Sequence, residues 1–248
     1  MNKAIRLTLL TLLPFCLWAQ TLTRMVAQFP VIVEGDTLSM PFSGGFNGPI
    51  PQFLDWDHDG FLDLFITDGD GRIQHYETDG STPDSFTLIT RTFNDLIIGF
   101  WFYFFDYDLD GDHDLIHSSV FPTAGGAYAF VVYENVDGTL IFRTERLLDD
   151  QGRVLTVSSV VIPTFTDIDG DDWADLFIGS VAGSVTKYSN LGMRDSLPLF
   201  QFETNTFQNI MLVWSPGRGR RHGASALEFF DIDADGDKDL FWGDLYQP

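Results

Sequence analysis

The sequence contains very little cysteine and few basic residues. Its only cysteine is Cys16, which excludes a disulfide framework and cysteine-braced calcium repeats. Lysine and arginine number 14 against 36 aspartates and glutamates, which gives a formal charge of −22 at pH 7. Such acidity argues against nucleic acid and anionic membranes as partners. Sustained 3.6-residue apolar periodicity without Gly or Pro interruption is also missing, which argues against a helical fold.

Hydrophobic and aromatic residues are abundant by contrast. They make up 44% and 15% of the chain, and this content favours a packed core over disorder. The apolar residues occur in short β-branched and aromatic runs between turn residues. We therefore predict an all-β chain.

The N-terminus has the pattern of a secretory signal peptide. Lys3 and Arg6 precede an apolar run over residues 7–18, and Ala19 offers a small residue at the cleavage position. The run is too short to span a bilayer, which needs about 20 residues. We expect a protein secreted to the exterior, the cell surface or a periplasm, without membrane insertion after cleavage. The alternative is a buried N-terminal strand, which explains the charged flank less well.

One eleven-residue pattern occurs four times, at residues 55–65, 106–116, 167–177 and 231–241 (loops 1 to 4). Each copy has aspartate at its first, third, fifth and ninth positions, which suits calcium because calcium takes six to eight oxygen ligands. The predicted carboxylate ligands are Asp55, Asp57, Asp59, Asp63, Asp106, Asp108, Asp110, Asp114, Asp167, Asp169, Asp171, Asp175, Asp231, Asp233, Asp235 and Asp239. The predicted seventh-position carbonyl ligands are Phe61, Asp112, Trp173 and Asp237.

Electrostatics explain why such loops would need an ion. Two carboxylates about 4 Å apart repel by roughly 4 kcal/mol at an effective dielectric near 20. Solvated Asp-Gly turns are the alternative interpretation, but turns do not require four aspartates at a fixed spacing. EF-hand loops are excluded because no glutamate occupies the twelfth position. Loop 3 departs from the pattern, with Gly170 fourth and Asp172 sixth, which leaves its backbone path and occupancy open.

The repeat extends beyond the loops. A phenylalanine precedes each loop by two residues (Phe53, Phe104, Phe165, Phe229), and a tyrosine follows three of them (Tyr76, Tyr133, Tyr188). We predict turns at Asp79-Gly80, Asp137-Gly138 and Leu191-Gly192, followed by strands around Phe86, Phe142 and Phe200. Four antiparallel strands per unit describe a β-propeller blade. The aromatic run over residues 100–105 is predicted to be buried, with a sugar-stacking platform as the alternative.

The repeat sets the expected boundaries. We expect residues 1–19 to form the signal peptide and residues 20–42 to form an N-terminal strand segment able to close a ring. Three blades are expected over residues 43–98, 99–160 and 161–222, and the start of a fourth over residues 223–248. About four blades are present, at the lower limit for closed propellers. We therefore expect a larger ring that continues into further blades or domains.

The pattern D-x-D-x-D-G-x-x-D-L-F after an aromatic strand resembles the FG-GAP and VCBS-type repeats of the integrin-alpha-like β-propeller superfamily. The resemblance covers residues 43–248, and the missing Phe-Gly…Gly-Ala-Pro signature favours the VCBS-type branch. It implies one calcium per blade, bound between the first two strands on the face opposite most ligand sites. Position by position, it implies the same ligands as those given above.

Three functions remain open. The first is a secreted or surface-exposed calcium-binding module that binds an extracellular protein or glycan, as in adhesion. Its cationic loop with Arg218, Arg220 and Arg221 would grip a carboxylate or sulfate, unless these arginines are merely solvated. The second is the propeller portion of a carbohydrate-active enzyme such as a polysaccharide lyase, although the sequence shows no nucleophile–base pair and we predict no enzyme. The third is a passive scaffold.

Overall fold

The computed structural model describes residues 31–37, 45–46, 48–78, 80, 86–211 and 226–243. The chain divides into two compact units, residues 1–44 and 45–248. In the first unit, β1 (Ile32–Val33) and β2 (Asp36–Thr37) form an antiparallel hairpin. The expected signal peptide, most of the segment 20–42 and the cationic cluster Arg218, Arg220 and Arg221 lie outside the described residues.

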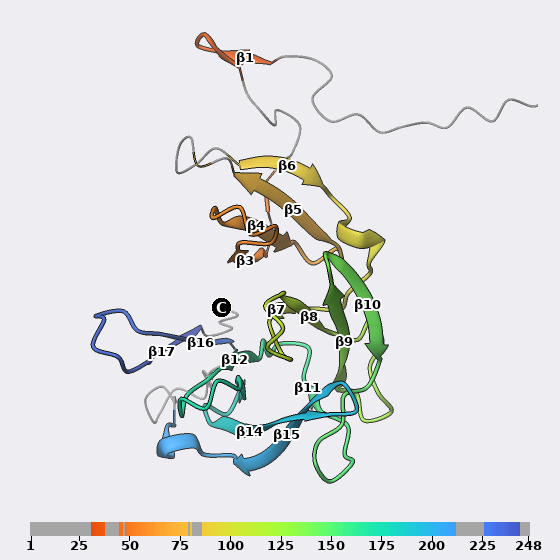
Figure 1. Cartoon of the computed structure of the whole chain (residues 1–248), viewed down its shortest axis with the longest axis vertical. Coiled ribbons are helices and arrows are strands. Elements are labelled where there is room, and N and C mark those ends of the chain that lie inside the picture. Colours follow the sequence, from red (N-terminus) through yellow and green to blue (C-terminus); the bar gives the residue numbers. More distant parts are fainter. Residues whose placement is uncertain are drawn as a thin grey trace, which may run out of the picture. The chain divides into compact units, whose positions relative to one another are not determined.

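The second unit consists of antiparallel sheets (Figure 1). The first sheet contains β3 (Ile50–Leu54), β4 (Asp63–Thr67), β5 (Ile73–Thr78) and β6 (Phe86–Thr90) in chain order. The second contains β7 (Phe102–Phe105), β8 (Asp114–Ser118), β9 (Tyr128–Val136) and β10 (Thr139–Thr144), and β11 (Thr156–Val157) also pairs with β9. The third contains β12 (Thr164–Thr166), β13 (Asp175–Gly179), β14 (Val185–Arg194) and β15 (Leu197–Thr204). The fourth contains β16 (Ala226–Phe230) and β17 (Asp239–Gly243).

Helical structure in the described residues is confined to two short 3₁₀ turns, η1 (Phe93–Asp95) and η2 (Phe207–Asn209). No helix found there has both the length and the hydrophobicity needed to cross a membrane. The prediction of an all-β chain built from antiparallel units of four strands is confirmed for the first three sheets.

The register repeats from sheet to sheet. The phenylalanine ahead of each loop pairs with a leucine of the second strand in all four sheets: Phe53 with Leu64, Phe104 with Leu115, Phe165 with Leu176 and Phe229 with Leu240. In the first three sheets the same leucine faces the predicted tyrosine: Tyr76, Tyr133 and Tyr188. The spacing in the sequence therefore corresponds to equivalent places in the sheets.

One predicted turn is confirmed and another is wrong. Asp137 and Gly138 form the two-residue turn between β9 and β10, both with positive φ. Leu191 and Gly192 do not turn the chain, because β14 runs through them to Arg194. Gly192 instead lies at a register shift, where its N–H donates a 3.0 Å bond to the Asn190 side chain. A glycine inside a strand marks a bulge as readily as a turn.

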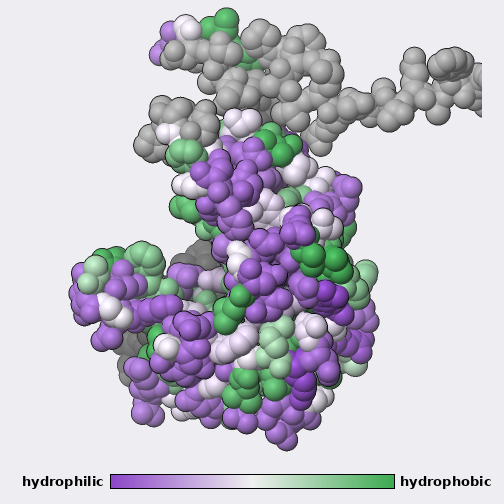
Figure 2. All heavy atoms as spheres, viewed as in Figure 1, coloured by the Kyte–Doolittle hydropathy of each residue, from purple (hydrophilic) through white to green (hydrophobic). Residues whose placement is uncertain are grey.

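Three hydrophobic clusters join neighbouring sheets. The first and second sheets share a cluster around Phe65 and Phe104, the second and third share one around Phe105 and Phe165, and the third and fourth share one around Phe177. Among the described residues, no such cluster joins the fourth sheet to the first. The described sheets therefore do not form a closed ring. Figure 2 shows a mostly hydrophilic visible face with small hydrophobic patches, as expected for a chain whose aromatic residues pack between sheets.

A phenylalanine from a 3₁₀ turn completes two of these clusters. Phe93 of η1 lies 5.0 Å from Phe65 and 6.0 Å from Phe104, measured between ring centroids. Phe207 of η2 lies in the equivalent place, 5.0 Å from Phe177 and 6.4 Å from Phe229. Each ring thus packs between its own sheet and the next one along the chain.

The aromatic run over residues 100–105 is largely buried, as predicted. Trp101, Phe102 and Phe104 are at most 2% exposed, and Phe105 is 9% exposed. Only Phe100, at 45%, is substantially open to solvent. The run therefore supplies core packing for the second sheet. Too little of its aromatic surface is exposed for the alternative, a platform on which sugars stack.

Candidate functional site

Each aspartate loop joins the first two strands of its sheet. Loops 1 to 4 lie between β3 and β4, β7 and β8, β12 and β13, and β16 and β17. The first loop position directly follows the incoming strand, and the ninth begins the outgoing strand. The flanking residues are strand formers, so the sheet fixes both ends of the loop while the aspartates between them fold over it.

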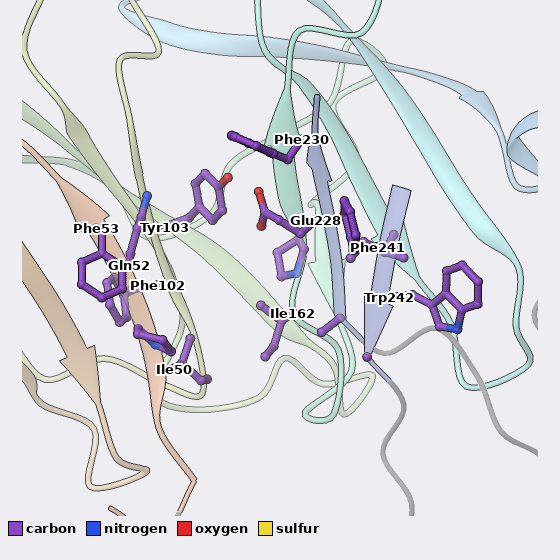
Figure 3. Close-up of a pocket in the computed structure, with 15 residues that line it drawn as sticks. Ile50, Gln52, Phe53, Phe102, Tyr103, Ile162, Glu228, Phe230, Phe241 and Trp242 are labelled. Carbon is purple, nitrogen blue, oxygen red and sulfur yellow. The ribbon is translucent and has the colours of Figure 1, made fainter. Parts of the chain in front are cut away.

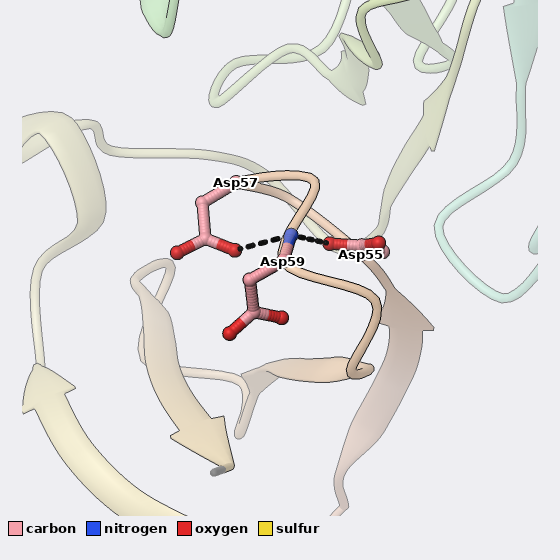
Figure 4. Close-up of side chains that lie close together, drawn as sticks. All are labelled: Asp55, Asp57 and Asp59. Carbon is pink, nitrogen blue, oxygen red and sulfur yellow. Dashed lines mark hydrogen bonds between the residues drawn. The ribbon is translucent and has the colours of Figure 1, made fainter. Parts of the chain in front are cut away.

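The first aspartate of each loop organises the backbone. In loop 1, the Asp55 carboxylate accepts hydrogen bonds from the N–H groups of Asp59 at 3.1 Å and Gly60 at 3.0 Å. Figure 4 shows the Asp59 N–H donating to both Asp55 and Asp57. The same two bonds, from the fifth and sixth positions, recur in the other three loops at 2.9–3.3 Å. Four separate stretches of sequence therefore fold into one loop type.

The seventh-position residues are placed by the fifth aspartate. The N–H of Phe61 donates to Asp59 at 2.8 Å, and equivalent bonds of 2.9 Å hold Asp112, Trp173 and Asp237. This bond orients the peptide group that immediately precedes the residue from which the sequence predicts a carbonyl ligand.

All four loops share left-handed backbone at two positions. The fourth position has a φ of 59° to 78° (His58, Leu109, Gly170, Ala234), and the sixth has a φ of 73° to 102° (Gly60, Gly111, Asp172, Gly236). Loop 3 follows the same path although Gly170 and Asp172 exchange the usual places of glycine and another residue. The backbone path that its sequence left open is therefore the same as in the other loops, since aspartate tolerates left-handed geometry better than most residues.

The loops bring carboxylate oxygens within 4.8 Å of one another in four sets. The sets are Asp55, Asp57 and Asp59; Asp106, Asp108 and Asp114; Asp167, Asp169 and Asp171; and Asp231, Asp233 and Asp239. Of the predicted carboxylate ligands, Asp63, Asp110, Asp175 and Asp235 lie outside these compact sets. In loop 2, Oδ1 of Asp108 is buried and accepts no hydrogen bond. Hard oxygen donors with an unsatisfied buried oxygen among them fit a divalent cation such as calcium.

The ninth-position aspartates of the first three loops are buried. Asp63, Asp114 and Asp175 are 4%, 0% and 1% exposed. Burial raises the pKa of Asp63 to about 6 and that of Asp114 to about 8, and neighbouring aspartates add to both shifts. Burial also raises the pKa of Asp175. A cation beside these carboxyl groups would favour their charged form and counter the shift.

A buried lysine beside loop 3 was not found from the sequence. Nζ of Lys187 on β14 lies 3.1 Å from Oδ2 of Asp175. The signal was present in the spacing, because Lys187 immediately precedes Tyr188, the tyrosine that repeats in three sheets. The alignment of that tyrosine with Tyr76 and Tyr133 places Lys187 on the third strand of its sheet. That strand pairs with β13, which begins at the ninth aspartate of the loop, Asp175.

A second site is a groove of about 660 Å³ between the inner strands. β3, β7, β16, β17 and residues 162–163 line it. Figure 3 shows Tyr103 and Glu228 pointing toward each other across it, with Phe230 and Phe241 on the same side as Glu228 and Trp242 pointing away from them beyond β17. Burial raises the pKa of Tyr103 to about 12, and the Glu228 carboxylate adds to the shift. The groove is therefore aromatic, with one carboxylate exposed to solvent.

Comparisons with known proteins identify no family for the chain. No protein-family model matches the chain, and no curated protein is significantly similar to it.

Proposed function

We propose that this chain is a secreted, calcium-binding module of the β-propeller type, related to the VCBS-type repeats, that binds an extracellular protein or glycan. The observation that carries the proposal is the recurrence of one aspartate loop, with the same hydrogen bonds and the same two left-handed positions, between the first two strands of all four sheets. Solvated turns would have no reason to repeat this geometry four times.

In this proposal calcium stabilises the sheets. Each ion would neutralise carboxylates of one loop and tie the end of the incoming strand to the start of the outgoing strand. Because the second strand of each of the first three sheets is buried, holding its first residue in place also supports the aromatic cluster behind it. A ring of such sheets, continued by blades beyond those described, is the arrangement that the repeated register favours.

The calcium part is tested by removing and restoring the ion. We expect a chelator to lower the melting temperature by 10 °C or more (about 2–4 °C per kcal/mol for a chain of this size), and excess calcium to restore it. Magnesium at the same concentration is the control, because its demand for octahedral geometry fits these loops poorly. A melting temperature that does not respond to chelator, together with no calcium in elemental analysis, would refute the proposal.

The groove is the candidate contact surface for a ligand. Aromatic side chains stack on the apolar faces of sugars, and the Glu228 carboxylate can accept hydrogen bonds from hydroxyl groups. We expect Phe241→Ala, which removes a ring on the same face of the sheet as Glu228, to weaken binding to glycans found on an array by at least about tenfold. Phe121→Ala is the matched control, because Phe121 is 81% exposed and does not line the groove. Equal effects of both changes would show that the groove is not the binding surface.

The secretion part rests on residues 1–19 and is tested directly. We expect the mature protein to begin at Gln20 when it is recovered from the medium, the cell surface or the periplasm of its expression host, as read by N-terminal mass spectrometry. An uncleaved chain retained in the cytoplasm would refute this part alone.

A further inference from the structure

The third sheet contains a buried lysine that reaches its metal loop. Nζ of Lys187 lies 3.1 Å from Oδ2 of Asp175 and 2.9 Å from Oε2 of Glu203. The side chains of Lys187 and Asp175 are 7% and 2% exposed, so water screens their interaction weakly. Ser189 also donates a 2.8 Å hydrogen bond to Glu203, which holds the outer partner of the lysine in place.

The first and second sheets have no such charge at this position. His75 in the first sheet and Val132 in the second precede the equivalent tyrosines. Nε2 of His75 is 3.9 Å from Oδ2 of Asp63 and makes no hydrogen bond, so no ammonium group faces loop 1 from this position. Among the three sheets whose third strand is described, only the third places a permanent positive charge against the loop.

The ninth aspartate is also held differently in loop 3. In the other three loops its Oδ2 accepts a hydrogen bond from the N–H of the second loop residue. These donors are Trp56 at 3.2 Å, Tyr107 at 3.0 Å and Ile232 at 3.2 Å. In loop 3 the Oδ2 of Asp175 faces the ammonium group of Lys187, while Oδ1 accepts the N–H of Asn190 at 2.9 Å. Oδ1 of Asp175 is thus hydrogen-bonded within the third sheet, while its buried Oδ2 accepts no hydrogen bond and is held by the charge of Lys187 alone.

We propose that Lys187 is the built-in cation of loop 3, so that this loop folds without calcium and binds it at least about tenfold more weakly than loops 1 and 2. A divalent ion entering loop 3 would meet a fixed positive charge, and Asp175 would have to leave that charge to ligate the ion. The inference rests on the proposed calcium function and adds to it a ranking of the loops by their affinity for calcium.

The first test leaves Lys187 in place. Calcium bound per chain is measured by equilibrium dialysis and elemental analysis, at a free calcium concentration that saturates only the tight sites. We expect Asp57→Asn in loop 1 to remove one tight site and Asp169→Asn, at the same third position of loop 3, to remove none. If Asp169→Asn also removes a tight site, the proposal is overturned.

The second test removes the charge. Lys187→Met keeps most of the aliphatic stem that packs in the sheet and deletes the ammonium group. We expect this variant to gain one tight calcium site, and to lose it again when Asp169→Asn is added. Lys187→Arg, which keeps the charge, should bind the wild-type number of ions. An unchanged number in Lys187→Met overturns the proposal; should that variant fail to fold, the comparison of Asp57 with Asp169 decides.

The calcium function and the role of Lys187 are refuted by different results. If the wild-type chain binds no calcium at any loop, the proposed function fails and this inference fails with it. If the wild-type chain binds calcium and loop 3 is as tight as loop 1, the calcium function stands and only the role of Lys187 is refuted.

Discussion

Phe104 and Phe53 occupy the same position in successive sheets, yet their side chains are 1% and 53% exposed. Phe104 packs on the sheet before it, with its ring centroid 4.7 Å from that of Phe65 and 6.0 Å from that of Phe93. Among the described residues, the one aromatic neighbour of Phe53 is Phe86 of its own sheet, at 6.1 Å between ring centroids. The burial of this repeated phenylalanine is therefore decided by the neighbouring sheet.

This difference predicts unequal costs for the same substitution. Phe104→Ala should lower the free energy of unfolding by about 3–5 kcal/mol, because it opens a cavity between two sheets. Phe53→Ala should cost less than about 1 kcal/mol, since its ring is half exposed. Urea denaturation of both variants in calcium measures the two values. Equal losses would mean that the two sheets do not pack as described.

The coordination pattern predicts that position matters more than charge. Asp108→Asn removes a third-position carboxylate of loop 2 and should weaken calcium binding at that loop by about tenfold or more. Asp112→Asn removes the same charge at the seventh position, which is predicted to offer only its backbone carbonyl, and should change affinity less than about threefold. Isothermal titration calorimetry separates them. Similar effects would show that calcium responds to charge density and not to a defined ligand set.

The left-handed sixth position predicts a stabilising change in loop 3. Asp172 has a φ of 73° and an exposed side chain that is not a predicted ligand. Asp172→Gly should raise the free energy of unfolding by about 0.5–1 kcal/mol, because glycine adopts this conformation without strain. Gly60→Ala at the same position of loop 1 should lower it by about 1–2 kcal/mol.

No atom beyond the neighbouring residues lies within 4 Å of a β-carbon placed at Gly60. The loss of stability in Gly60→Ala would therefore come from backbone strain alone. Thermal denaturation of both variants with and without calcium measures the effect. Stabilisation by Gly60→Ala would contradict the shared backbone path.

A buried histidine predicts acid sensitivity independent of the metal ligands. His117 on β8 is 3% exposed, and burial lowers its pKa to about 4, although its bond to the Ser118 carbonyl opposes the shift. The unfolded chain takes up this proton near pH 6.5 while the folded chain does not, so stability is lost as pH falls from about 6.5 to 4. The full contribution is about 3 kcal/mol.

The matching variant is His117→Ile, because Ile66 and Ile178 hold this position in the first and third sheets. Guanidinium denaturation at pH 7 and pH 4.5 should show the wild-type chain losing about 2 kcal/mol more than the variant between the two values. Parallel losses in both proteins would show that His117 does not titrate in this window.

The loops were predictable because their information is local. Eleven contiguous residues contain the aspartates, the glycine and the first residues of the outgoing strand. The hydrogen bonds that the first aspartate accepts come from residues at most five positions away. Gly192 shows the limit of local reasoning. Its residue type allows a turn or a bulge, and pairing of β14 with β15 selects the bulge.

The sequence by itself determined the strand type, the loop positions and the repeat length, because each depends on neighbours along the chain. Only the tertiary structure decided which repeated aromatic residues are buried and which aspartate receives a lysine. Those outcomes depend on side chains from different strands meeting across or between sheets, and a spacing pattern contains no distance between strands. The Lys187–Asp175 pair is the clearest case: its members are twelve residues apart in the chain and 3.1 Å apart in space.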